Sequence, residues 1–174
     1  MLFVVRHAKA HDRDPREWPD DSERPLTKGG ARRFAALARA VAERFDPPSV
    51  VLASSYVRAW QTAKLLEENA LWPPPERASI LECDEDASAE VICAWLARAV
   101  RGAESAALVG HEPVLSELVS ELLGCHGPGV AMAKGAIAVL RVRDPALLLE
   151  AASYPGSCAE LLALVEPRWL GTDE

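Results

Sequence analysis

The sequence predicts a single α/β domain over residues 1–174, a three-layer α/β/α sandwich with a mainly parallel sheet and an antiparallel edge. Short apolar segments rich in β-branched residues, at 2–5, 49–53 and 105–109, are typical of buried strands. Segments with helical periodicity separate them, which predicts right-handed crossovers between parallel strands. Two later apolar segments lie close enough in sequence to pair as antiparallel strands. A chain of 174 residues can enclose one sizeable core.

Turn residues and apolar periodicity divide the first half of the chain into alternating elements. In order they are an exposed loop at 11–24, a helix at 27–45, a strand at 49–53, a helix at 56–69 and a short strand at 79–82. Thr27 is the predicted N-cap of the first helix, since a hydroxyl there can accept from a free backbone N–H group. Ser54 and Ser55 can cap the second helix in the same way.

The second half continues the alternation and supplies the predicted antiparallel edge. Its elements are a helix at 87–100, a strand at 105–109, a helix from Pro113 to about residue 123, strands at 136–142 and 147–152, and a closing helix at 157–165. Pro113 suits a first helical turn, because the N–H group that it lacks has no partner there. Val91, Trp95 and Leu96 recur at helical spacing and are expected to face the core.

Composition limits the compartment and the partners. The net charge of −7 argues against general nucleic-acid binding. No apolar run approaches the length that crosses a bilayer, and the first apolar segment is too short for a signal peptide. The four cysteines form no C-x-x-C pair, so we expect free thiols. These features predict a cytoplasmic protein that binds neither membranes nor nucleic acid, and they leave its oligomeric state open.

Three predicted strand-to-helix junctions carry cationic or titratable residues. The first strand ends at Arg6-His7, Arg58 follows the second strand, and the third ends at Gly110-His111. In a parallel sheet these junctions share the edge at the carboxyl ends of the strands. Such a cluster would repel itself unless it bound an anion, and guanidinium groups suit the oxygens of a phosphate. The pattern therefore predicts a phosphoryl-binding site.

The same residues suggest a reaction. Imidazole can act as a nucleophile and form a covalent intermediate. Phosphoryl transfer depends mostly on positioning and charge stabilisation, which two arginines and a second histidine can supply. We therefore expect no metal ion and no other cofactor. Arg6 and Arg58 are expected to lower the pKa of His7, because neighbouring cations disfavour the imidazolium.

Four motifs then identify a family. Arg6-His7-Ala8 resembles the R-H-G signature of the histidine phosphatase superfamily, also called phosphoglycerate-mutase-like. Three further segments of the chain resemble motifs of the same superfamily. They are Arg24-Pro25-Leu26-Thr27-x-x-Gly30, Ser54-Ser55-x-x-Arg58-Ala59-x-Gln61-Thr62-Ala63 and Gly110-His111. The resemblance runs from residue 1 to about 142, with Ala8 where glycine is common. The short chain has no long insertion that could form a lid. In this respect it is most similar to the SixA-type phosphohistidine phosphatases.

The resemblance implies roles for individual residues. His7 would be the nucleophile and would become phosphohistidine. Arg6, Arg58 and His111 would bind and neutralise the phosphoryl oxygens. The family also implies an α/β/α fold and a site without metal.

Family members that act on alkyl phosphates use a carboxyl group to protonate the leaving oxygen. Glu82, Asp84, Glu85 and Asp86 stand in the matching region, and Asp84 and Glu85 are the predicted candidates. Imidazole leaves more readily than an alkoxide, because the reference pKa of histidine is only about 6.5. Because the sequence identifies no single carboxyl group as the general acid, it favours a substrate that needs little acid assistance, a phosphoramidate such as phosphohistidine.

Three hypotheses follow. The leading one is a metal-independent phosphatase that acts on phosphohistidine of a partner protein, since a site without a lid admits a loop or a domain surface. The first alternative is a phosphatase of the same superfamily for small sugar or nucleotide phosphate esters. The second is a non-catalytic module that binds phosphate or a phosphoprotein, although the presence of all four pocket residues argues against it.

Overall fold

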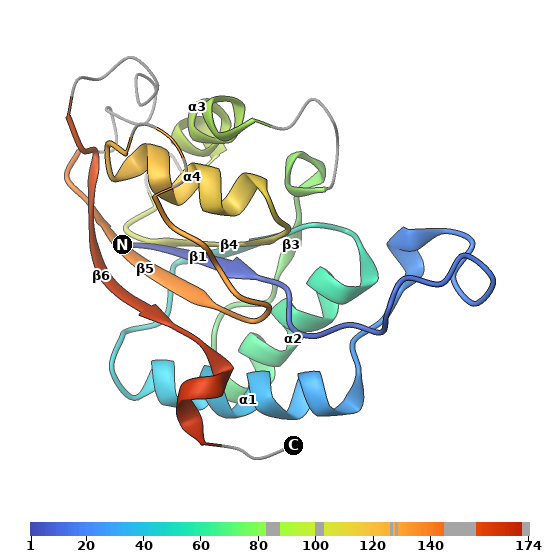
Figure 1. Cartoon of the computed structure of the whole chain (residues 1–174). Helices are drawn as coiled ribbons and strands as arrows, with labels where there is room; N and C mark the ends of the chain where they lie inside the picture. Colours follow the sequence, from blue (N-terminus) through green and yellow to red (C-terminus); the bar gives the residue numbers. More distant parts are fainter. Residues whose placement is uncertain (83–87, 100–102, 126, 128, 145–155, 172–174) are drawn as a thin grey trace.

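The computed structural model describes residues 1–82, 88–99, 103–125, 127, 129–144 and 156–171 (Figure 1). In these residues a six-stranded sheet has the order β3-β2-β4-β1-β5-β6. Its strands are β1 (Leu2–Arg6), β2 (Val50–Ala53), β3 (Glu76–Arg77), β4 (Ala106–Gly110), β5 (Ile137–Val142) and β6 (Ala159–Val165). The strands β3, β2, β4 and β1 pair in parallel, whereas β5 runs antiparallel to β1 and β6 antiparallel to β5. The predicted parallel sheet with an antiparallel edge is confirmed.

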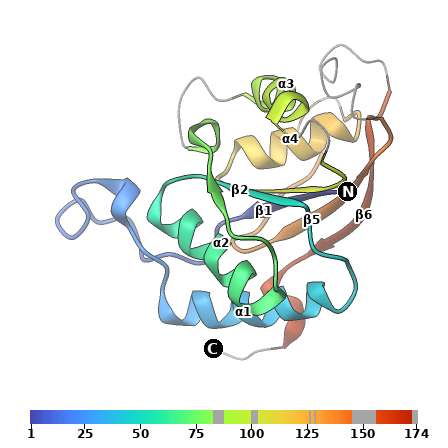
Figure 2. The ribbon, with the colours of Figure 1, turned by 180° about the vertical axis from the view of Figure 1, so that it is seen from behind.

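Helices cover both faces of the sheet. The α-helices are α1 (Lys28–Ala42), α2 (Val57–Ala70), α3 (Ala89–Ala99) and α4 (Val114–Leu122), and the short 3-10 helices are η1 (Asp21–Glu23), η2 (Ser79–Leu81) and η4 (Pro167–Leu170). α1 and α2 lie on one face, and α3 and α4 on the other (Figures 1 and 2). This is the predicted three-layer arrangement. None of the helices among the described residues has the length and apolar character needed to span a membrane.

Strand β1 divides the apolar core into two clusters. Phe3 and Val5 pack with the apolar residues of α1 and α2, whereas Leu2 and Val4 pack with those of α3 and α4. Alternate side chains of a strand point to opposite faces, and both faces are covered, so the strand is apolar throughout. Burial on both sides therefore fixes the strand that leads to His7 at the centre of the molecule.

The start of α1 is docked against the chain just beyond β1. Thr27 is its N-cap, as predicted, and the Thr27 hydroxyl accepts a hydrogen bond from the Gly30 N–H at 2.9 Å. The Thr27 N–H and hydroxyl both donate to the Lys9 carbonyl oxygen, at 3.0 and 3.1 Å. A Cβ atom at Gly30 would overlap that oxygen. The close approach requires glycine, and it holds the segment after His7 in place.

The predicted short strand at 79–82 is wrong. The backbone there closes into η2, in which the Leu81 N–H donates to the Ala78 carbonyl oxygen. The edge strand β3 lies earlier, at Glu76–Arg77, where it pairs with β2. The apolar side chains at 79–82 suited a strand, but the turn buries Leu81 without any pairing.

The predicted closing helix at 157–165 is also wrong, because this segment contains strand β6. It pairs with β5 over its whole length, with a register irregularity at Val139/Leu140. An apolar segment of this length has no decisive periodicity, and the exposed edge of β5 determines its conformation. The strand predicted at 147–152 lies outside the described residues. The predicted antiparallel edge of the sheet is therefore present, and the strand that pairs with β5 there is β6.

Two local predictions need smaller corrections. Val91 is 44% exposed, Trp95 is half-buried, and Ile92, Cys93 and Leu96 form the buried face of α3. Neither predicted serine is the N-cap of α2, because Tyr56 occupies that position without a side-chain capping bond.

Candidate active site

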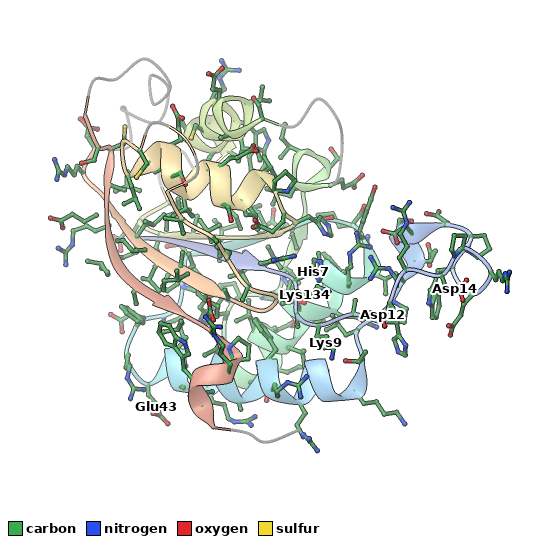
Figure 3. All side chains as sticks on the ribbon, viewed as in Figure 1. His7, Lys9, Asp12, Asp14, Glu43 and Lys134 are labelled. Carbon is green, nitrogen blue, oxygen red and sulfur yellow. The ribbon has the colours of Figure 1, made fainter. Side chains whose placement is uncertain are left out.

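The register of the sheet brings the two histidines together. Arg6 on β1 pairs with Gly110 on β4, so His7 and His111 are the next residues on two adjacent parallel strands. The His7 N–H donates to the Gly110 carbonyl oxygen at 3.0 Å. The centroids of the two imidazole rings are 5.2 Å apart, with an interplanar angle of 54°. Figure 3 shows His7 at the carboxyl edge of the sheet.

His7 is held in one protonation state and one orientation. Its side chain is buried, and Nδ1 lies 2.7 Å from the Ala8 carbonyl oxygen. A carbonyl oxygen only accepts, so Nδ1 carries the proton and Nε2 keeps its lone pair. Burial lowers the pKa of His7 to about 4, with smaller contributions from Arg58 and Arg6. The expected effect of the two arginines is therefore present, but desolvation is the larger cause, and the ring is neutral near pH 7.

His111 is deeper and is oriented by Ser54. Its Nε2 lies 2.9 Å from the Ser54 hydroxyl, which in turn accepts from the Tyr56 N–H at 3.2 Å. The Ser54 hydroxyl can donate its proton to Nε2, and in that arrangement the ring proton of His111 is on Nδ1. That buried nitrogen has no hydrogen-bond partner among the described residues. Burial, then Arg58, lowers the pKa of His111 to about 2, so it can donate from Nδ1 while remaining neutral.

The two arginines are anchored differently. Arg6 is half-buried, and its Nη1 donates to the Met132 carbonyl oxygen at 2.6 Å. The side chain of Arg58 is 4% exposed, and its Nη2 lies 3.2 Å from an Asp21 carboxylate oxygen. Its Nη1 also donates to the Asp21 backbone carbonyl at 2.7 Å, and its guanidinium lies 5.0 Å from the centroid of the Tyr56 ring.

Asp21 is a site residue that no sequence motif indicates. It lies on η1, inside the segment predicted only as an exposed loop. Its carboxylate also binds the Arg24 Nε at 2.9 Å. The hydrogen bond from Arg24, followed by the charge of Arg58, lowers the pKa of Asp21. In the sequence Asp21 is one of several acidic residues in a polar loop, and no local pattern distinguishes it. Its role depends on how the loop folds back over α2.

Other residues of the second motif tie the surrounding loops to α2. The Thr62 hydroxyl accepts from the Ala8 N–H at 3.0 Å and donates to the Arg58 carbonyl oxygen at 2.7 Å. The Gln61 side-chain oxygen accepts from the Leu26 N–H at 2.8 Å. These bonds fix the two ends of the segment between β1 and α1 against the helix that carries Arg58.

The predicted acid candidates Asp84 and Glu85 lie outside the described residues. Glu82, also considered from the sequence, is half-buried and accepts a hydrogen bond from the Ser55 hydroxyl. Ser55 follows Ser54, the partner of His111. Glu82 is therefore a carboxyl group at the border of the site.

The arrangement fits an incoming phosphoryl group. Two neutral imidazoles lie together at the sheet edge, and the charges of Arg58 and Arg6 both act on His7. Fixed cations and hydrogen-bond donors of this kind stabilise the negative charge on the oxygens of a phosphoryl group while it is transferred, and they need not give up a proton to do so.

Known proteins share both the sequence pattern and the fold. Residues 2–88, half of the chain, match the Histidine phosphatase superfamily (branch 1). An uncharacterized protein of Picosynechococcus is 30% identical over 171 residues, which cover 97% of this chain and 98% of the relative. The structure of the protein histidine phosphatase SixA complexed with tungstate is similar, with a TM-score of 0.78, 22% identity and coverage of 97% and 98%. A mycobacterial glucosyl-3-phosphoglycerate phosphatase is also similar, with a TM-score of 0.64, 16% identity and coverage of 93% and 97%.

The solved structures share the fold, and the sequence match covers the Arg6-His7 and Arg58 motifs. On this basis the chain belongs to the histidine phosphatase superfamily.

Proposed function

We propose that this phosphatase forms a phosphohistidine intermediate on His7, needs no metal ion, and acts on phosphohistidine carried by a protein. The observation that carries the proposal is the pairing of His7 and His111, 5.2 Å apart, with Nε2 of His7 unprotonated beside the buried Arg58. Arg6, Arg58 and His111 bind the phosphoryl oxygens in this scheme.

The reaction has two balanced steps. In the first, Nε2 of His7 attacks phosphorus, the P–N bond to the substrate imidazole breaks, and that imidazole takes up a proton from solvent. In the second, water attacks the phosphoryl group on His7, the new P–N bond breaks, and inorganic phosphate leaves. The proton of the attacking water passes to the phosphate or to solvent. Each step moves one phosphoryl group past fixed cations, which is where such sites obtain most of their rate acceleration.

Two observations support a phosphohistidine substrate. Imidazole is a good leaving group because its reference pKa is about 6.5, so the first step demands little from an acid. The similar SixA structure is that of a protein histidine phosphatase and covers almost the whole chain.

One observation favours a second candidate, a phosphatase for small phosphate esters. Glu82 lies beside Ser55 at the border of the site, where a carboxyl group could protonate a leaving alkoxide. The similar mycobacterial enzyme is a glucosyl-3-phosphoglycerate phosphatase.

A substrate panel tests the proposal. Phosphate release is measured from a phosphohistidine peptide, phosphoserine and sugar phosphates, each with and without a chelator. We expect the phosphohistidine peptide to have the highest kcat/KM and the chelator to have no effect. Failure to hydrolyse any phosphoramidate would contradict the proposed substrate, and inhibition by the chelator would contradict the metal-free mechanism.

A further inference from the structure

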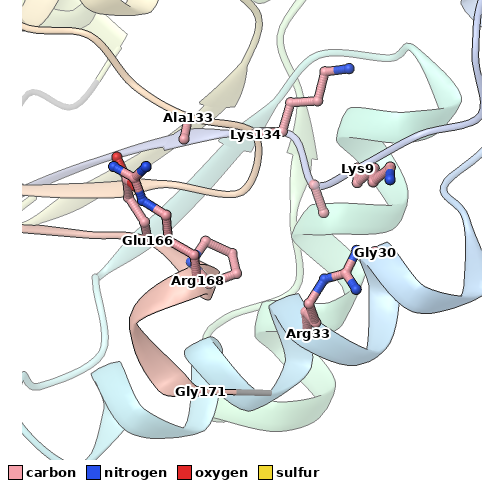
Figure 4. Close-up of a pocket in the computed structure, with 10 residues that line it drawn as sticks. Lys9, Gly30, Arg33, Ala133, Lys134, Glu166, Arg168 and Gly171 are labelled. Atoms are coloured by element: carbon pink, nitrogen blue, oxygen red, sulfur yellow. The ribbon is translucent and has the colours of Figure 1, made fainter. Parts of the chain in front are cut away.

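A groove begins where the residues of the candidate site end. It has a volume of about 410 Å³, and Ala8, the residue after His7, forms part of its wall. Four basic residues line it, Lys9, Arg33, Lys134 and Arg168, together with one acidic residue, Glu166. Figure 4 shows these side chains around the groove, which we call the basic groove.

The basic groove is fixed to the candidate site by hydrogen bonds. The Gly135 N–H donates to the His7 carbonyl oxygen at 2.9 Å, and the Met132 carbonyl accepts from Arg6. Lys134 thus stands between two residues that are bonded to the Arg6-His7 motif. Lys9 is two residues beyond His7, and Figure 3 shows both lysines near that histidine. The basic groove therefore adjoins the candidate site, so a substrate bound at His7 can extend into it.

The charge of the groove opposes the charge of the whole chain. The net charge of the protein is −7, yet four cations and one carboxylate line this surface. Glu166 is buried and pairs with Arg168. No carboxylate of the described residues lies within ion-pair distance of Lys9, Arg33 or Lys134. Like charges gathered without counter-charges raise the local potential and attract anionic ligands.

The spacing of the cations indicates the kind of anion. They come from separate elements: Lys9 follows β1, Arg33 is on α1, Lys134 precedes β5, and Arg168 is on η4. Figure 4 shows Arg168 on one side of the groove, with Lys9 and Arg33 on the other. One compact phosphate is bound by donors that converge on it, often in bidentate geometry. Cations spread along a groove suit several carboxylates of an extended segment.

We propose that the basic groove binds an acidic segment of the protein substrate, in which aspartate or glutamate residues flank the phosphohistidine. This inference rests on the proposed function and adds a preference among phosphohistidine proteins. The groove would hold the flanking chain while the phosphoryl group lies at His7. A second phosphate of a small ester is the competing occupant, and the test below includes it.

Two matched peptides test the preference. Each carries one phosphohistidine, flanked by Asp and Glu in the first and by Asn and Gln in the second. At low ionic strength we expect kcat/KM to be about tenfold higher for the acidic peptide, because three charge pairs in a groove open to solvent each contribute a small amount. The ratio should shrink as salt is added, since exposed charges are screened.

Substitutions then locate the preference. In the triple variant K9Q/R33Q/K134Q the ratio between the two peptides should fall to near one. The matched control R44Q/R98Q/R141Q removes the same number of charges outside the groove and should keep the ratio of the wild type. Equal kcat/KM for both peptides in the wild type, or a ratio that both triple variants lower equally, would overturn the proposal.

A binding measurement separates the groove from the chemistry. Fluorescence anisotropy with labelled, unphosphorylated versions of both peptides needs no turnover. We expect the acidic peptide to bind more tightly than the neutral one, and K9Q/R33Q/K134Q to remove the difference. If neither phosphopeptide is hydrolysed, the proposed function fails. The binding measurement then still shows whether the basic groove prefers an acidic peptide. If the triple variant weakens binding of pyrophosphate but not of the acidic peptide, the groove serves a small ester and the inference is wrong.

Discussion

The imidazole rings of His7 and His111 lie 5.2 Å apart although the two residues come from different halves of the chain. Their pKa values are both lowered, chiefly by burial, so two neutral rings face each other. A proton on either ring would also be opposed by Arg58. The positive charge of the site therefore resides on its arginines, and both histidines are neutral, as the proposed roles of nucleophile and donor require.

Trapping the intermediate tests the role of His7. Brief incubation with ³²P-labelled phosphohistidine peptide and rapid quenching at alkaline pH should leave acid-labile label on the protein. In H7A we expect no label and a fall in kcat on the order of 10³-fold or more, as for loss of a covalent nucleophile. H11A is the control, since His11 is exposed. Label that persists in H7A would assign the nucleophile elsewhere.

The two buried histidines should make folding stability depend on pH. Their folded-state pKa values, about 4 and about 2, lie below the unfolded value near 6.5. The unfolded chain therefore binds more protons as the pH falls below 6.5, and stability is lost until the pH passes the folded values. Between pH 7.5 and 5.5 we expect the free energy of unfolding in urea to fall by about 2–3 kcal/mol.

The variant H7Q/H111Q should lose much less over the same interval, because glutamine does not titrate there. H11Q, which replaces an exposed histidine outside the site, is the control for the substitution itself. Phosphate-free buffer avoids stabilisation by a bound anion. An equal loss of unfolding free energy in the wild type and the double variant would show that the pH dependence does not come from His7 and His111.

Two adjacent glycines at the start of α1 should respond in opposite ways to alanine. A Cβ at Gly30 would overlap the Lys9 carbonyl oxygen, whereas a Cβ at Gly29 would meet only the Arg33 side chain at 3.7 Å. We expect G30A to destabilise the fold by about 1–3 kcal/mol, as overpacking does. G29A should be neutral or stabilising by up to about 1 kcal/mol, since alanine favours helix. Thermal and urea unfolding of both variants measure the difference, and equal effects would contradict the docking of α1 described above.

The ion pair between Asp21 and Arg58 should restrain the site. D21N removes the carboxylate charge from the ion pair with the buried Arg58 guanidinium, which we expect to lower stability by about 1–3 kcal/mol. Inorganic phosphate should inhibit this variant more strongly, because the anion no longer competes with a carboxylate. E43Q is the control, since the pair between Glu43 and Arg44 is largely exposed and contributes little. Weaker inhibition by phosphate in D21N would mean that Asp21 instead holds Arg58 in its binding position.

Glu82 should matter for esters and not for phosphohistidine. If its carboxyl group protonates a leaving alkoxide, E82Q should lower kcat on phosphoserine about 10²-fold or more, the usual range for a general acid. Activity on the phosphohistidine peptide should change little, since imidazole leaves without strong acid assistance. The double variant D84N/E85Q provides the comparison. A loss on phosphoserine in this double variant but not in E82Q would assign the acid to the sequence-predicted pair.

Much of the fold could be predicted because its signals are local. The strand that leads to His7 is buried on both faces, so its apolar run alone indicated a strand. Thr27 marked the start of α1 through its capping chemistry. Strand β6 carried no such signal, because its apolar residues suit a helix or a strand equally. Pairing with β5 decided its conformation.

By itself the sequence determined which groups are candidates for the chemistry: His7, His111, Arg6 and Arg58 stand at strand ends and in a first helical turn, positions that local patterns mark. Only the tertiary structure decided what surrounds them. The strand order places β4 between β1 and β2, and this order sets His111 beside both His7 and Ser54. It also decided that Asp21 pairs with Arg58 and that Lys9 and Lys134 share a groove. The reason is physical: capping and burial act between near neighbours in sequence, whereas these contacts depend on how distant segments pack together.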